Sequence, residues 1–281
     1  MAKILEKKLL AKDIYEITVD APKVVKRGQP GQFVLVMADE KSERIPLTIA
    51  DFNREKNTLT MVMMAVGVST MKIAAKEVGE SFYAVLGPLG TASEIENFGH
   101  AVMVAGGVGS APIFPIARAL REAGNKITII QGARTKDLLF WDDKLAQIAN
   151  EHIVCTDDGT FGRKGRVTEP LLEILEQGKA NSSQKAGICY AIGPEIMMKV
   201  VSEATRPYEL KTIVSLNTIM IDGTGMCGGC RVLVHGETKF TCVDGPEFDG
   251  HGVDWNLFSA RQRLYKKHEH CSLERYRENK D

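Results

Sequence analysis

The sequence has no long apolar run, no excess of either charge and few cysteines. None of its 281 residues lies in an apolar segment of about 18 residues, the length that a membrane-spanning helix requires. Lys plus Arg and Asp plus Glu both number 36, and this balance argues against a nucleic-acid-binding surface, which usually needs an excess of basic residues. The N-terminus lacks the apolar core and cleavage site of a signal peptide, so we expect a cytoplasmic location.

Six cysteines are too few for a disulfide scaffold in a chain of this length. Three of them, Cys227, Cys230 and Cys242, lie within 16 residues of a glycine-rich segment. Clustering of this kind indicates a metal site rather than a set of disulfide bridges. Cys155 and Cys189 fall in predicted buried strands, and we interpret them as small core residues.

The chain divides into three segments by pattern. Residues 1–98 hold short apolar and β-branched stretches separated by Gly and Pro, which predicts a small antiparallel barrel or sandwich. Residues 99–211 alternate buried-strand patterns with amphipathic helical patterns, one of them over 137–148, which predicts an α/β domain with a parallel sheet. Residues 212–281 hold one more strand, the cysteine cluster and a charged tail predicted to be helical.

The cysteine spacing points to a particular kind of metal site. Cys227, Cys230 and Cys242 follow the spacing C-x2-C-x11-C. Plant-type [2Fe–2S] sites use C-x4-C-x2-C and a distant fourth cysteine, and on that pattern the first ligand position falls on Asp222. A carboxylate oxygen binds ferric iron, so Asp222 is the predicted fourth ligand. The alternatives are zinc, held by the cysteines with Asp222 or His235, and a loop of unligated thiols.

A glycine-rich turn, GGVGSAP at residues 106–112, lies between a predicted buried strand and a predicted helix. Glycines let the backbone approach a pyrophosphate, and the helix that follows offers free N–H groups. Tight helix packing alone is the alternative. The next strand ends without the acidic residue that is usual for NAD, while Arg134 and Lys136 are compatible with the 2′-phosphate of NADP. The candidate nucleotide-binding residues are Gly106, Gly107, Gly109, Ala111, Pro112, Gly132 and Arg134.

Taken together, these stretches resemble the ferredoxin–NADP reductase family over nearly the whole chain. RIPLT at residues 44–48 is similar to its flavin-binding signature, although the spacing is one residue longer than in the plant reductases. GVST at residues 67–70 is similar to its flavin-pyrophosphate segment. The resemblance implies that flavin is bound by Arg44, Pro46, Leu47, Thr48, Gly67, Val68, Ser69 and Thr70. To the nucleotide site it adds Asp157, Asp158, Gly193 and Pro194.

The most similar branch of that family has a C-terminal [2Fe–2S] segment. It includes electron-transfer subunits of dihydroorotate dehydrogenase and small subunits of NADH-dependent reduced ferredoxin:NADP oxidoreductase, also known as sulfide dehydrogenase. In the second group an aspartate replaces the first cluster cysteine, as Asp222 does here.

The resemblance implies an electron-transfer subunit that binds FAD, a [2Fe–2S] cluster and NAD(H), with NADP(H) also compatible. It further implies a heterodimer with a larger iron–sulfur flavoprotein subunit, and exchange with ferredoxin through a bifurcating complex. Dihydroorotate or sulfide oxidation is the alternative within electron transfer. A flavin-free zinc-binding module is the alternative outside it.

Overall fold

Two antiparallel sheets form the N-terminal part of the protein, whose computed structural model describes residues 2–278. Their strands are β1 (Ala2–Ala11), β2 (Ile14–Asp20), β3 (Phe33–Met37), β4 (Ile45–Thr48), β5 (Asp51–Asn53), β6 (Thr58–Met64), β7 (Ser81–Phe82) and β8 (Ala84–Leu89). The sheets have the orders β5-β6-β2-β1-β7 and β4-β3-β8. Ile17 and Val19 of β2 share one buried apolar cluster with Val34 and Val36 of β3, and this cluster holds the sheets together. The predicted antiparallel barrel is confirmed.

A third, larger sheet follows in the chain. Its strands are β9 (His100–Gly106), β10 (Lys126–Ala133), β11 (Glu151–Thr156), β12 (Arg163–Lys164), β13 (Ile188–Ile192), β14 (Thr212–Ser215) and β17 (Glu247–Asp249). Their order is β12-β11-β10-β9-β13-β14-β17. Strands β9 to β14 pair in parallel, whereas β17 runs antiparallel to β14. The carboxyl ends of the parallel strands therefore lie along one edge of the sheet, as the predicted α/β domain requires.

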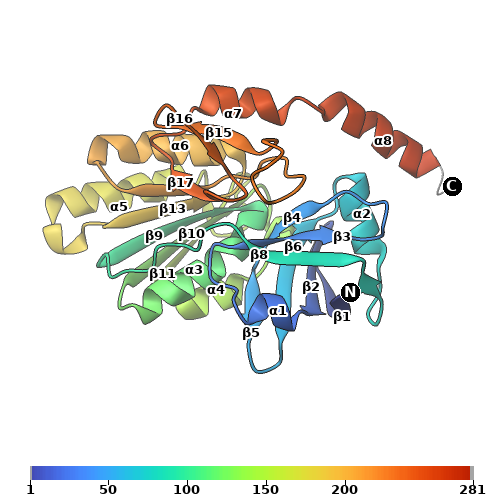
Figure 1. Ribbon diagram of the computed structural model, residues 1–281. Helices are drawn as coiled ribbons and strands as arrows, with labels where there is room; N and C mark the ends of the chain where they lie inside the picture. The colour runs from blue at the N-terminus through green and yellow to red at the C-terminus, as the bar shows by residue number, and fades with distance from the viewer. Residues whose placement is uncertain (1, 279–281) are drawn as a thin grey trace.

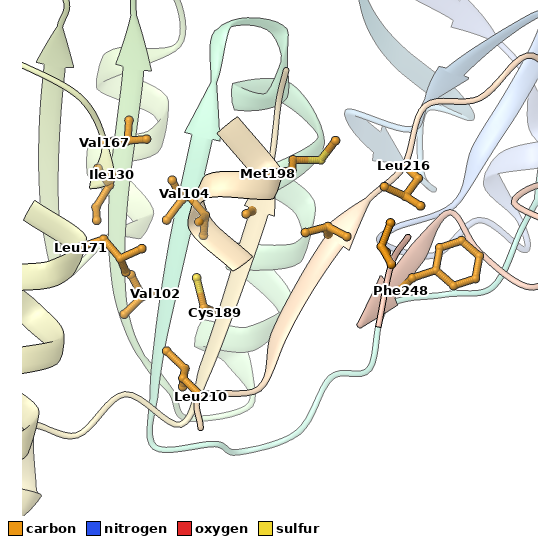
Figure 2. Packing of buried hydrophobic residues seen from close by; sticks show 14 of the residues in the cluster. Val102, Val104, Ile130, Val167, Leu171, Cys189, Met198, Leu210, Leu216 and Phe248 are labelled. Atoms are coloured by element: carbon orange, nitrogen blue, oxygen red, sulfur yellow. The ribbon is translucent and has the colours of Figure 1, made fainter. Parts of the chain in front are cut away.

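Helices cover both faces of this sheet (Figure 1). They are α3 (Ser110–Glu122), α4 (Asp142–Ile148), α5 (Thr168–Ala180) and α6 (Glu195–Thr205). Alternate residues of β9 pack on opposite faces of the sheet, because successive side chains of a strand point in opposite directions. Val102 and Val104 belong to the cluster shown in Figure 2, which includes Leu171 of α5 and Met198 of α6. Met103 belongs to the cluster on the other face, with residues of α3 and α4.

The helix predicted over 137–148 is shorter than expected. A single helical turn at Lys136–Leu138 is followed by an extended segment, and α4 begins only at Asp142. Trp141 interrupts the helix because its backbone is left-handed, with φ of 58°. Its indole Nε1 donates a hydrogen bond of 2.8 Å to Glu16 of the barrel. A contact between distant parts of the chain therefore overrides the local helical pattern.

The C-terminal segment is built onto the larger sheet. Its elements beyond β14 and β17 are α7 (Trp255–Gln262), α8 (Lys266–Glu278) and the antiparallel hairpin of β15 (Arg231–Val234) and β16 (Glu237–Phe240). Val232, Val234, Trp255 and Phe258 join the apolar cluster of the sheet. The sheet thus continues past the predicted boundary at residue 211. Helix α8 buries no residue and extends across the top of the molecule toward α2 (Val68–Ala75) (Figure 1).

Salt bridges tie the barrel to the parallel-sheet part. Asp51 of β5 accepts hydrogen bonds of 2.9 Å from both Arg118 of α3 and Lys144 of α4. The first helix of the chain, α1 (Pro22–Val25), belongs to the barrel. None of the helices within residues 2–278 combines the length and the apolar composition needed to cross a membrane.

Candidate functional site

A cavity of about 880 Å³ lies where the carboxyl edge of the parallel sheet faces the barrel. Its walls come from the ends of β9, β10 and β13, from barrel strands β4 and β6, and from the segment after β14. Ligands of open α/β sheets bind outside the carboxyl ends of the strands, and this cavity occupies that position. Its volume falls in the range typical of cofactor sites.

The glycine turn after β9 forms part of the cavity wall. At Gly107, where φ is +53°, an added Cβ would meet no atom within 4 Å, so the space beside this backbone is open to a ligand. At Gly109 an added Cβ would lie 1.9 Å from the carbonyl oxygen of Ile192, so only glycine lets the turn pack against β13. Helix α3 begins at Ser110 directly behind the turn and presents its N-terminus there. These features fit a bound pyrophosphate.

Charged side chains line the cavity on the side of the parallel sheet. Arg134, Arg166 and Asp157 are exposed and line its wall. Within residues 2–278 the guanidinium groups of both arginines lack a hydrogen-bond or ion-pair partner. Asp158 does not line the cavity, and its carboxylate accepts hydrogen bonds from the backbone N–H and hydroxyl of Thr160. These bonds hold the pKa of Asp158 below its ordinary value.

On the barrel side, strand β4 supplies Pro46, Leu47 and Thr48 to the cavity wall. Thr70, in the first turn of α2, also lines it, and its hydroxyl oxygen accepts hydrogen bonds of 3.1 and 3.0 Å from the backbone N–H groups of Val66 and Gly67. These bonds cap the helix and hold the hydroxyl at the cavity.

Four other flavin candidates lie outside the cavity lining. Gly67 and Val68 begin α2 beside it, and the buried Ser69 donates a hydrogen bond of 2.9 Å to Glu43. Arg44 points elsewhere, since its Nη1 donates to the carbonyl oxygen of Ile221, 3.2 Å away.

The cavity brings together most of the candidates that the sequence supplied. Those in its lining are Pro46, Leu47, Thr48, Thr70, Gly106, Gly107, Gly109, Ala111, Pro112, Gly132, Arg134, Asp157, Gly193 and Pro194. Their individual roles stay predictions, as do those of Arg44, Gly67, Val68, Ser69 and Asp158.

Several lining residues come from segments that the sequence did not point to. Ser215 ends β14, Asn217 and Met220 follow it, and Pro246 precedes β17. They reach the cavity only because β14 and β17 join the sheet. Arg166 was also missed, although its position just before the N-terminus of α5 at the sheet edge is a signal that could have identified it.

The cysteine segment forms a loop without helix or strand at residues 217–230, which we call the cluster loop. Left-handed glycines shape it, for example Gly223 with φ of +75°. The carboxylate of Asp222 accepts hydrogen bonds from the backbone N–H groups of Thr224, at 2.9 Å, and Cys227, at 2.7 Å. These bonds hold the pKa of Asp222 below its ordinary value.

The four predicted metal ligands form two pairs. In the first pair, the thiols of Cys230 and Cys242 are buried, with their Sγ atoms 3.2 Å apart. In the second pair, the carboxylate of Asp222 accepts a hydrogen bond from the backbone N–H of the exposed Cys227. Two tetrahedral ligands at about 2.3 Å from one metal lie about 3.8 Å apart, so a small rotation would let both thiols bind a single iron. Within residues 2–278 no three such side chains surround one point closely enough for a lone metal ion.

Burial disfavours the charged form of the Cys242 thiol. Burial, together with the neighbouring Cys230, raises the pKa of the Cys242 thiol above its ordinary value. A metal would reverse this, because a coordinating thiol loses its proton. The donor set therefore fits an iron–sulfur cluster, in which each iron takes two protein ligands.

An apolar contact joins the cysteine pair to the cavity. Cys230 and Cys242 share a buried cluster with Phe33 of β3 and with Met220 of the cluster loop. Phe33 and Met220 also line the cavity. One layer of side chains thus separates the sulfur atoms from the cavity.

Two family models match the chain. The iron–sulfur cluster binding domain of dihydroorotate dehydrogenase B matches residues 217–254, which include the cluster loop and Cys242. The oxidoreductase NAD-binding domain matches residues 103–203, which include the glycine turn. The predicted iron–sulfur and NAD-binding segments are thereby confirmed. With the barrel, they define an NAD-linked iron–sulfur oxidoreductase subunit with a ferredoxin-reductase fold.

Similar proteins extend over almost the whole chain. A Thermotoga maritima protein, named as a homologue of the dihydroorotate dehydrogenase B (NAD(+)) electron transfer subunit, is 46% identical over 97% of this chain and 94% of its own length. The dihydroorotate dehydrogenase B electron transfer subunit of Desulforamulus reducens is 32% identical over 90% of this chain and 97% of its own length.

One solved structure is similar to this protein in both sequence and fold. A chain from the NADH-dependent reduced ferredoxin-NADP oxidoreductase structure, described for its insights into flavin-based electron bifurcation, is 44% identical, with a TM-score of 0.90 and 98% of each chain covered. The protein therefore belongs to the family of dihydroorotate dehydrogenase B electron transfer subunits and their homologues.

Proposed function

We propose that this chain is the NAD(H)-linked electron-transfer subunit of a flavin iron–sulfur oxidoreductase and works with a larger partner subunit. When bound, FAD supplies the exchange between two-electron and one-electron transfer, and a [2Fe–2S] cluster supplies one-electron transfer to the partner. The single observation that carries this proposal is the layer formed by Phe33 and Met220, which belongs both to the cavity wall and to the cluster around Cys230 and Cys242. This apolar layer lies between the two proposed cofactor sites.

The residues of the cavity divide between two ligands. On the barrel side, Pro46, Leu47 and Thr48 would hold the flavin ring, and the hydroxyl of Thr70 would contact the flavin pyrophosphate. On the sheet side, the glycine turn at residues 106–112 would take the nucleotide pyrophosphate.

Most of the remaining nucleotide candidates also line the cavity. Gly132, Arg134 and Asp157 would contact the adenosine end, and Gly193 and Pro194 would flank the nicotinamide. Apolar walls and these few polar groups together orient the two rings and keep water away from them.

The ligand set of the cluster would be Asp222, Cys227, Cys230 and Cys242. Their pairing supports two iron atoms with two protein ligands each, and it does not match zinc, which takes four ligands around one ion. The exposed Cys227 would place one iron near the surface, where a partner subunit could approach.

The names of the relatives suggest the larger assembly. The similar structure belongs to an NADH-dependent reduced ferredoxin-NADP oxidoreductase, and we favour a heterodimer of that kind, which exchanges electrons with ferredoxin through its larger subunit. A dihydroorotate-oxidising complex is the second candidate, since relatives at 32% identity carry that name. Analysis of the protein that copurifies with this chain would distinguish the two.

The proposal is tested by anaerobic purification from the native source. We expect a coloured protein with absorbance near about 450 nm, acid-labile sulfide and about two irons per chain. Addition of NADH should lower that absorbance and produce the paramagnetic resonance signal of a reduced cluster. A folded protein that is colourless and free of iron would refute the proposal.

The assignment of Asp222 has its own test. Replacement Asp222→Ala should lower the iron content or change the resonance signal, because one iron loses its oxygen ligand, while the flavin content stays near that of the wild type. Asp222→Cys should restore iron and give the signal of an all-thiolate cluster. Unchanged iron and an unchanged signal in Asp222→Ala would remove Asp222 from the ligand set.

A further inference from the structure

Three arginines from three separate elements bond to the backbone of the cluster loop. Arg44, just before β4, donates from Nη1 to the carbonyl oxygen of Ile221 at 3.2 Å. Arg261 of α7 donates from Nη2 to the carbonyl oxygen of Gly229 at 2.9 Å. Arg231 of β15 donates from Nη1 to the carbonyl oxygen of Gly228, three residues earlier in the chain, at 3.4 Å. Arg44 of the barrel and Arg261 of α7 thus fix the loop by hydrogen bonds from elements outside it.

The charges of these arginines are not neutralised. Ion pairs are formed elsewhere by Arg118, with Asp51, and by Arg163, with Glu173. Within residues 2–278, by contrast, none of the three loop-binding arginines has a carboxylate in salt-bridge range. No carboxylate in the described part of the chain therefore offsets their positive charges at the loop.

The contacted carbonyls stand next to proposed ligands. Ile221 directly precedes Asp222, and Gly229 directly precedes Cys230. A guanidinium at each of these carbonyls fixes the backbone from which a ligand side chain projects, and it places a positive charge near the metal site. Arg261 is partly buried, so its charge is screened less by water than that of the exposed Arg44.

A cluster held by three thiolates and a carboxylate carries a net negative charge, which grows by one when it is reduced. Positive charges nearby favour the reduced form over the oxidised form. Resting on the proposed [2Fe–2S] site, we propose that Arg44 and Arg261 are positioning residues that hold the cluster loop and stabilise the reduced cluster by their charge. Arg44 thereby acts at the cluster, and the barrel communicates electrostatically with the metal site.

The test is a redox titration of the intact cofactor-loaded protein, followed by paramagnetic resonance. In Arg261→Gln, the ratio of reduced to oxidised cluster at a fixed potential should fall about fivefold, or about 40 mV in midpoint for a one-electron couple. Arg44→Gln should shift the midpoint in the same direction by less, because Arg44 is more exposed. Arg261→Lys keeps the charge and should stay near the wild-type midpoint.

The matched control is Arg263→Gln, which removes an equal charge from an exposed residue two positions from Arg261. Within residues 2–278 the Arg263 side chain forms no hydrogen bond or ion pair with the loop. Equal midpoints in wild type, Arg261→Gln and Arg44→Gln would overturn the proposal. Equal shifts in Arg261→Lys and Arg261→Gln would also overturn it, because packing rather than charge would then be responsible. Arg44→Gln lies in the barrel and serves as the second variant if Arg261→Gln does not fold. A wild-type protein without a cluster signal would instead refute the proposed function.

Discussion

The cavity and the cluster loop differ in what gives them shape. The cavity wall consists of strand ends and the start of α3, and these rest on apolar clusters on both faces of the larger sheet. The cluster loop, residues 217–230, contains no helix or strand. It is held by hydrogen bonds that its backbone N–H groups donate to Asp222 and by hydrogen bonds from arginines on other elements. Core packing fixes the first site before any ligand binds. The second has little apolar material of its own, so the metal would supply much of its order.

This contrast predicts that a substitution that abolishes cofactor binding in one region leaves cofactor binding in the other region intact. The largest effect should come from Cys242→Ser, which removes one thiolate of the buried pair. We expect near-complete loss of iron and of the cluster signal, with flavin content and reduction by NADH preserved, because the cavity does not depend on the cluster. Metal analysis and anaerobic absorbance spectra measure both quantities.

The control for this variant is Cys271→Ser, at an exposed position on α8, which should keep its iron. Should Cys242→Ser retain full iron and an unaltered signal, Cys242 would not be a ligand, and the contrast between the two regions would lose its basis.

The converse change damages the cavity. In Gly109→Ala the new Cβ would fall 1.9 Å from the carbonyl oxygen of Ile192, so the glycine turn must move away from β13. We expect a loss of about 2–4 kcal/mol in the free energy of unfolding and at least about tenfold weaker NADH binding, with the cluster signal retained. Denaturant titration and NADH titration measure these changes.

Gly107→Ala separates sterics from ligand contact, because a Cβ there meets no protein atom. The left-handed φ should cost only about 1 kcal/mol, while NADH binding should still weaken. NADH affinity that is unaffected in both variants would show that the turn does not hold the nucleotide.

A pH-dependent effect on stability alone concerns Glu247, on the strand that adjoins both regions. Its carboxylate accepts a hydrogen bond of 2.7 Å from the hydroxyl of Ser93, and burial raises its pKa from 4.5 to about 7. The folded protein holds this proton more tightly than the unfolded chain does. The stabilisation is therefore complete below about pH 4.5 and is lost as the pH rises toward 7.

Glu247→Gln mimics the protonated form at every pH. Above pH 7 the variant should exceed the wild type in the free energy of unfolding by about 2 kcal/mol, and the difference should shrink toward pH 5. Urea titrations at several pH values measure this difference. Glu122→Gln, at an exposed position on α3, is the control and should follow the wild type. A pH-independent difference in Glu247→Gln would contradict the raised pKa.

The sequence predicted the parts of each site that depend on local pattern. The glycine turn between a buried strand and a helix and the spacing from Asp222 to Cys242 both follow from residues close together in the chain. The structure places Cys155 and Cys189 in the core as predicted, because apolar runs in parallel strands are buried on both faces.

Contacts between distant residues could not be predicted in the same way. The left-handed conformation of Trp141 accompanies a hydrogen bond from its indole to Glu16 of the barrel. The hydrogen-bond acceptor of Arg44 is a carbonyl oxygen 177 residues further along the chain. Met220 reaches the cavity because β14 and β17 extend the larger sheet toward the barrel.

The sequence alone determined which chemical groups are present and how they are spaced, because glycine conformation, strand burial and cysteine spacing are properties of short segments. Only the tertiary structure decided that the cysteine pair lies one side-chain layer from the cavity and that two arginines from separate elements grip the cluster loop. The physical reason is that such neighbours are selected by the packing of whole sheets and helices, and this depends on the complete chain.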